Sequence, residues 1–235
     1  MNFLKLSILV VASLMFTSCS NDRALKAKAK ELAQKFIITD GHIDTPWKLS
    51  KNYEDISLRT KTGDFDYVRA KEGGLNVPFM AIYIPSSYLE TGGAKEKADS
   101  LIDMMEQIAD KDPDKFEIAY SLADANRIFK EGKVALPLGM ENGAGIEDDI
   151  SNLKHFYDRG IRYITLTHSK DNLICDSSYD EEEDTWSGLS PYGRKVVKEM
   201  NRLGIMVDIS HVTDEVINQV LDMTDVPVAV SYTHL

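Results

Sequence analysis

Three of the five histidines in this chain follow short apolar runs that are typical of buried β-strands. They are His42, His168 and His211, and Glu141 follows a fourth run of the same kind. In α/β proteins the chemistry lies at the carboxyl ends of the parallel strands, so we expect these four side chains to lie together. Imidazoles with a carboxylate form a ligand set that suits a metal ion. The spacing therefore predicts a metal site at the strand ends.

Asp44 adds a second carboxylate beside His42. Residues two positions apart in an extended segment point to the same side, so His42 and Asp44 could bind one ion while Ile43 faces away. A polar turn ahead of Pro46 would explain the same pair without a metal. The other strand ends favour the metal.

The remaining candidates leave more than one role open. The carboxylate of Glu141 is costly to bury unless it is paired or binds a metal, and its two oxygens could bridge two cations. His211 is either a ligand or a satisfied histidine in a loop. His168 fits a ligand, a hydrogen-bond donor to a transition state or a polar core residue, and spacing alone does not choose among these.

The elements that position these residues alternate along the chain in the manner of an α/β fold. Continuous apolar strands alternating with helices indicate a parallel sheet covered on both faces. Either an open doubly wound sheet or an incomplete barrel fits, and no glycine-rich phosphate loop favours the former. We expect strands at 36–40, 80–84, 134–140, 161–167, 204–209 and 226–230, and helices at 24–35, 94–109, 121–131, 149–159, 191–203 and 214–223.

The first residues predict export. Lys5 precedes an apolar run over 6–16, which is too short to span a bilayer, and small residues then lead to Cys19. This order resembles a bacterial lipoprotein signal. We expect a signal peptide at 1–18, a lipid on Cys19 as the membrane anchor, a tether or helix at 19–35, and a location in the cell envelope of a bacterium, facing the periplasm or the outside.

Composition limits the class of protein. The chain has 235 residues, 43% of them hydrophobic, and a formal net charge of −11, which describe one folded domain. Nucleic acid is excluded as a partner because binding phosphates requires clustered Lys and Arg. A closed (β/α)₈ barrel usually needs about 250 residues, so this chain lies near the lower limit for one.

Several segments resemble the renal (membrane) dipeptidase family of zinc metallopeptidases. They include 40–46 (DGHIDTP, with Ile43 in place of the family's usual Asn), 162–169 (RYITLTHS) and 201–212 (NRLGIMVDISHV), which occur in the family's order. The resemblance implies a TIM-like (β/α)₈ barrel over 36–235, truncated after about six β/α units. It implies hydrolysis of dipeptides with two zinc ions, and it is compatible with a homodimer.

The resemblance also implies a role for each candidate residue. His42 and Asp44 would hold the first zinc, Glu141 would bridge both ions, and His211 would bind the second. Two cations that share a carboxylate can also share a water and lower its pKa into the neutral range. His168 matches a family residue that donates a hydrogen bond to the substrate carbonyl oxygen, so it would stabilise the oxyanion.

The chain departs from the family near residue 232. Tyr232 stands where the family has the His that completes the second zinc site, and His234 lies two positions further. Later family segments that supply an Arg and an Asp to the site are absent. We therefore expect an N-terminal fragment of low activity, in which residues 231–235 are foreign sequence. Two alternatives stay open: another barrel amidohydrolase or deaminase, and an envelope lipoprotein that binds peptide or metal without turnover.

Overall fold

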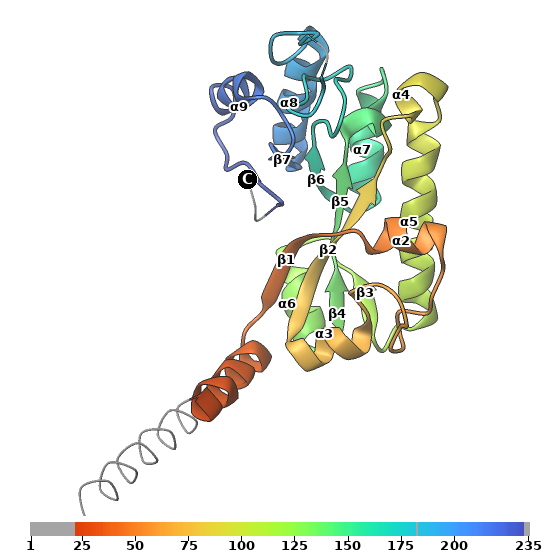
Figure 1. Ribbon diagram of the computed structural model, residues 1–235, viewed down its shortest axis with the longest axis vertical. Coiled ribbons are helices and arrows are strands. Elements are labelled where there is room, and N and C mark those ends of the chain that lie inside the picture. Colours follow the sequence, from red (N-terminus) through yellow and green to blue (C-terminus); the bar gives the residue numbers. More distant parts are fainter. Residues whose placement is uncertain (1–21, 182, 233–235) are drawn as a thin grey trace, which may run out of the picture.

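A parallel sheet forms the centre of the molecule. The computed structural model describes residues 22–181 and 183–232. Within them five strands pair side by side, all parallel, in the order β1-β2-β5-β6-β7 (Figure 1). These strands are β1 (Ile38–Ile43), β2 (Leu75–Tyr83), β5 (Leu138–Glu141), β6 (Ile161–Thr165) and β7 (Met206–Asp208). The predicted α/β class is confirmed.

Helices connect the strands and begin where the sequence has capping residues. The Ser190 side chain accepts a hydrogen bond from the Gly193 amide at the start of α8, and Thr213 does the same for Val216 at the start of α9. The helices are α2 (Thr45–Lys51), α3 (Tyr67–Gly73), α4 (Tyr88–Thr91), α5 (Ala94–Lys111), α6 (Leu122–Lys130), α7 (Ser151–Asp158), α8 (Pro191–Leu203) and α9 (Asp214–Leu221), with a 3₁₀ turn, η1 (Gly143–Ile146).

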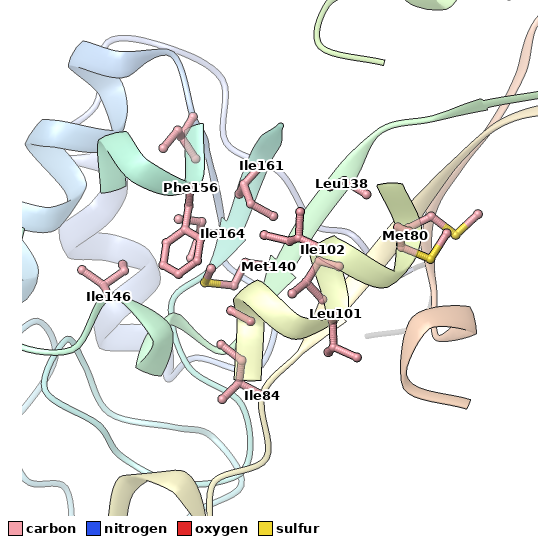
Figure 2. Close-up of a cluster of buried hydrophobic side chains, with 14 of the residues drawn as sticks. Met80, Ile84, Leu101, Ile102, Leu138, Met140, Ile146, Phe156, Ile161 and Ile164 are labelled. Atoms are coloured by element: carbon pink, nitrogen blue, oxygen red, sulfur yellow. The ribbon is translucent and has the colours of Figure 1, made fainter. Parts of the chain in front are cut away.

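The hydrophobic core lies between the sheet and the helices packed on it. Helix α5 buries residues at helical spacing, among them Leu101 and Ile102, which lie in one cluster with Met80 of β2 and Leu138 of β5 (Figure 2). Burying a side chain of this size stabilises the fold by about 1.5–3 kcal/mol. Helices α7 and α8 pack beside β6 and β7, so this end of the sheet is supported in the same way.

One predicted strand, 134–140, is divided at Pro137. Proline has no amide hydrogen to donate to a neighbouring strand. Before it, β4 (Val134–Leu136) pairs with β3 (Phe116–Ile118) in a separate two-stranded parallel sheet. After it, β5 joins the main sheet between β2 and β6. Because of this break, one continuous segment contributes a strand to each of the two sheets.

The predicted strand at 226–230 is wrong as a strand, although the segment lies beside β7. Only Ala229 bridges to Asp208, with hydrogen bonds from the Ile209 amide to the Ala229 carbonyl (3.0 Å) and from the Ala229 amide to the Val207 carbonyl (2.8 Å). Pro227 has no amide hydrogen, which prevents a longer ladder. The chain then reaches β1, where a hydroxyl of Ser231 lies 3.4 Å from a ring nitrogen of His42.

The described chain begins with a helix over 22–35 that is exposed along nearly its whole length. Figure 1 shows it projecting from the body beyond the start of β1. The predicted signal peptide and Cys19 lie outside the described residues. Among the helices that the structure describes, none is long and apolar enough to cross a membrane.

Candidate metal centre and active site

The five predicted site residues converge at the carboxyl end of the sheet. Nε2 of His42 lies 3.3 Å from Oε2 of Glu141 and 3.5 Å from Oδ1 of Asp44. Nε2 of His168 and Nε2 of His211 lie 3.4 and 3.3 Å from the other Glu141 oxygen, Oε1. Two sets of three potential ligands result. The first set is His42, Asp44 and Glu141, and the second is Glu141, His168 and His211. Within each set the ligand atoms lie within 4.8 Å of one another, and Glu141 belongs to both.

Each residue comes from the end of a strand or the turn that follows it. His42 is the next-to-last residue of strand β1, Asp44 is the residue before α2, and Glu141 ends β5. His168 follows β6, and His211 follows β7. The backbone of His211 has φ 67°, a left-handed conformation that costs free energy for most residues and that histidine adopts more readily. This turn brings its ring toward Glu141.

The turn after Glu141 is fixed by a buried asparagine. Asn142 also has a left-handed backbone, with φ 75°. Its amide nitrogen donates to the Ile84 carbonyl (2.9 Å), and its side-chain oxygen accepts from the Ala144 amide (3.2 Å). A second amide, that of Asn172, donates to the same oxygen (3.2 Å). The backbone that carries the Glu141 carboxylate is thereby held in one place.

The electrostatics of the first set suit a cation. Glu141 is only 2% exposed, and burial raises its pKa, but contacts with His211, His42 and Tyr232 outweigh burial and hold that pKa well below its ordinary range. Burial lowers the pKa of His42, whereas Asp44 and Glu141 together raise it to about 9. Without a metal, His42 therefore carries a proton that faces two carboxylates. A metal ion would replace this proton.

The second set contains a buried nitrogen without a hydrogen bond. Nε2 of His211 is within ion-pair distance of Glu141, yet it has no hydrogen-bond partner of acceptable geometry among the described residues. A buried polar atom without a partner is costly unless a ligand satisfies it. A cation bound between Nε2 of His211 and the Glu141 carboxylate would give this nitrogen a partner. The donor chemistry of both sets thus fits Zn²⁺.

Tyr232 reaches the centre of the cluster. Its hydroxyl lies 3.0 Å from Nε2 of His42 and contacts Oε1 of Glu141. Its ring packs against those of His42 (centroids 4.4 Å apart) and His211 (4.6 Å). Burial raises the pKa of this phenol well above its usual range. His234 lies outside the described residues, whereas Tyr232 lies at the site beside Ser231.

Sequence reasoning missed two tyrosines that lie beside the cluster. Tyr163 contacts the far side of the His42 ring, and Tyr83 packs edge-on against His168 with centroids 5.0 Å apart. Trp47 packs edge-on against Tyr83 in turn (5.2 Å), which makes an aromatic wall beside the cluster. The two tyrosines lie within apolar strands, where a tyrosine is most simply explained as core, so no spacing signal could have identified them.

The sequence matches the family model for membrane dipeptidases, peptidase family M19, over residues 26–235. The chain belongs to the membrane dipeptidase family. An uncharacterized dipeptidase of Schizosaccharomyces pombe is 34% identical over 221 residues, which cover 88% of this chain and 54% of that protein. Dipeptidase 3 of Mus musculus is 30% identical, over 91% of this chain and 44% of its own length. The chain thus spans about half the length of these relatives.

Solved structures agree with this membership. The probable dipeptidase PvdM of Pseudomonas aeruginosa superposes with a TM-score of 0.79 at 26% identity, covering 89% of this chain and 55% of its own. A metallopeptidase of Rhodobacter sphaeroides, liganded with a phosphinate mimic of the dipeptide L-Ala-D-Ala, gives 0.72 at 25% identity, covering 82% and 64%. The sheet of this membrane dipeptidase family member is therefore part of a TIM-like barrel, as predicted.

Proposed function

We propose that this protein is a zinc-dependent dipeptidase whose metal centre is built on Glu141. The observation that carries the proposal is the division of one buried carboxylate between two ligand sets. Its Oε2 faces His42 and Asp44, and its Oε1 faces His211. A carboxylate in this position can bridge two cations. Membership of a metallopeptidase family supports the same assignment.

In this proposal His42, Asp44 and Glu141 hold the first zinc, and Glu141 and His211 hold the second. Two zinc ions bound in this way would activate a water and polarise the peptide carbonyl. The protein's own contribution is to hold the ligands and to exclude bulk water. Glu141 and His42 are both buried, so their interaction with a bound cation would be weakly screened.

His168 is proposed to donate a hydrogen bond to the carbonyl oxygen of the scissile bond. Burial lowers the pKa of His168, so the ring is neutral near pH 7 and one of its nitrogens carries a hydrogen. Its side chain is 27% exposed, so a substrate could reach it. A single donor to a developing oxyanion contributes about 3–4 kcal/mol in a well-studied protease. Tyr83 packs against this ring and limits its movement.

The proposed substrate class is a dipeptide. The aromatic wall of Trp47 and Tyr83 borders the cluster on one side, which favours a small substrate over a long peptide. The Rhodobacter sphaeroides relative was crystallised with a dipeptide mimic, which supports the same class.

The chain as given is proposed to be weakly active. A phenol at Tyr232 replaces an imidazole that the family resemblance implies for the second zinc site. The hydroxyl also contacts Glu141 and His42, the groups that would face the metal.

Export and lipid attachment at Cys19 belong to the same proposal. A palmitate analogue that carries an alkyne would label the wild-type protein in cells, and Cys19→Ala would abolish the label. Labelling that survives this substitution would contradict the anchor.

Zinc binding tests the metal centre directly. Glu141→Ala should remove bound zinc as measured by elemental analysis after dialysis, because both ligand sets lose a member. Glu90→Ala, which changes an exposed carboxylate on α4, is the matched control and should leave the zinc content unchanged.

Activity is tested on the zinc-loaded protein with a mixed panel of dipeptides. Slow hydrolysis that disappears in Glu141→Ala is the expected result. Zinc content that is equal in wild type and Glu141→Ala would overturn the proposed function.

A further inference from the structure

The ring of His42 is held from the side opposite the metal site. Its Nε2 faces Glu141 and Asp44, while its Nδ1 lies 2.9 Å from the hydroxyl of Tyr163 and 3.4 Å from that of Ser231. Tyr163 comes from β6 and is 2% exposed. This phenol makes the shorter of the two contacts with Nδ1.

A glycine provides the space that the Tyr163 ring occupies. A Cβ atom at Gly139 would lie 2.1 Å from two ring atoms of Tyr163, far closer than any real contact. Phe79 packs on the same ring with centroids 5.4 Å apart. The register of β5 against β6 pairs Gly139 directly with Tyr163. The absence of a side chain at 139 thus fixes where the phenol sits.

The hydrogen bonds around Nδ1 favour one state of the imidazole. A histidine that binds a metal through Nε2 carries its hydrogen on Nδ1, and this hydrogen needs an acceptor. Ser231 donates its own hydrogen to Oδ2 of Asp208 (2.6 Å), so its oxygen is left with lone pairs facing Nδ1. Tyr163 offers a hydroxyl oxygen at the shorter distance. Both neighbours can therefore accept from Nδ1–H.

We propose that Tyr163, seated over Gly139, is a positioning residue that accepts a hydrogen bond from Nδ1 of His42 and thereby aims the Nε2 lone pair at the first metal position. This inference rests on the proposed function, because it assumes that His42 is a zinc ligand. Partners of this kind behind a metal-binding histidine typically contribute about 10–100-fold in metal affinity.

Tyr163→Phe tests the role because it keeps the ring and removes only the hydroxyl. Zinc affinity is measured by competition with a chromophoric chelator, and we expect the first ion to bind at least about tenfold more weakly. Tyr192→Phe is the matched control, since the buried hydroxyl of Tyr192 has no hydrogen-bond partner among the described residues. This control should bind zinc as the wild type does.

A second measurement separates positioning from general packing. In the zinc-loaded wild type, the Nδ1 proton of His42 should be visible by NMR and protected from exchange with solvent. Tyr163→Phe should speed that exchange while the amide spectrum of the core stays the same. A merely structural role of the phenol would alter the core signals and leave the Nδ1 proton protected.

Gly139→Ala should also weaken binding of the first zinc ion, because the new methyl group displaces the phenol of Tyr163. Gly73→Ala, where a Cβ would meet nothing within 4 Å, is its control. If Gly139→Ala does not fold, Tyr163→Phe still decides the matter. Zinc bound by Tyr163→Phe within about twofold of the wild type would overturn this inference alone. A wild type that binds no zinc would overturn the proposed function, and this inference with it.

Discussion

In the proposed function, Glu141, His42 and His211 are metal ligands, and His168 has a different role. His168 and His211 approach the same oxygen of Glu141 at nearly equal distances, so geometry alone would allow both to bind metal. The family resemblance instead assigns His168 to the substrate. Substitution by Ala distinguishes the two roles. Loss of a ligand lowers the zinc content, whereas loss of a hydrogen-bond donor to the substrate raises only the activation barrier of hydrolysis.

Replacing His168 by Ala should leave the zinc content unchanged and lower kcat by about 10²–10³-fold, because a donor to the oxyanion is lost. Elemental analysis and dipeptide hydrolysis on the same samples provide the two readouts. His155→Ala is a suitable control, since this ring pairs with Asp99 on α5 away from the cluster. Loss of one zinc from His168→Ala would instead make His168 a ligand.

Replacing Tyr232 by His should strengthen binding of the second zinc by about tenfold or more, because an imidazole nitrogen replaces a phenol whose hydroxyl holds its proton. Stepwise zinc titration by calorimetry would resolve the two ions. Tyr53→His, which places an imidazole on an exposed tyrosine outside the cluster, controls for the added histidine. Equal affinities in Tyr232→His and wild type would contradict this assignment.

The sequence was sufficient to identify the candidate site residues, but not the residues that hold them in position. His42, Glu141 and His211 stand out because polar groups at the ends of apolar strands are rare and costly. Tyr163 gives no such signal, since its hydroxyl becomes informative only when β6 is placed opposite β1. The metal-ligand roles stay predictions until zinc is measured.

At the scale of elements, the long amphipathic pieces were predictable and the short ones were not. Helices α5 and α8 show strong helical spacing, and their predicted positions are confirmed. Helices α2 and α3 have seven residues each, too few for a periodic pattern to rise above chance. Strand β3 has three residues and was missed for the same reason.

One short helix depends on a single buried carboxylate. Asp66 caps α3: its Oδ1 accepts from the Arg69 amide (2.8 Å), and its Oδ2 accepts from the Thr60 amide (3.1 Å) and from Nε of Arg69 (2.7 Å). Burial raises the pKa of Asp66, but these hydrogen bonds outweigh burial and lower it below the ordinary value.

The cap should therefore contribute a stability that depends on pH. Because the pKa is lower in the folded state, the contribution is present above the unfolded pKa of about 4 and is lost as the pH falls through the folded value. Asp66→Ala should cost about 1–2 kcal/mol near pH 7 and less at an acidic pH well below the unfolded pKa. Urea unfolding at both pH values, with Asp64→Ala as control, measures this. A cost that does not change with pH would contradict the charge-based explanation.

At the scale of the whole molecule, the segment 226–232 links β7 back to β1. Asp208 is fully buried, and it accepts hydrogen bonds from the Ser231 hydroxyl (2.6 Å), the Ser231 amide (3.1 Å) and the Ser210 hydroxyl (2.8 Å), with Thr165 of β6 as a further donor. This carboxylate therefore joins β6, β7 and the segment that reaches His42.

Asp208→Ala should destabilise the fold by about 3 kcal/mol, because several donors lose their partner in a buried place. It should also release Ser231 and Tyr232 from the metal cluster. Urea unfolding gives the first quantity, and proteolysis after residue 232, followed by mass spectrometry, reports the second. Asp225→Ala changes an exposed carboxylate directly before this segment and should do neither. Equal stability of both variants would count against the linking role.

The projecting helix over 22–35 is basic, whereas the chain as a whole is acidic. It carries five Lys or Arg side chains and two acidic ones, while the chain as a whole has a net charge of −11. At 1.5 Å per residue this helix is about 20 Å long, about two and a half Debye lengths at physiological ionic strength. On a lipid-anchored protein, anionic headgroups would attract this basic stalk and repel the acidic body. In the proposed lipid-anchored protein, the acidic body that carries the residue cluster would therefore face away from the membrane surface.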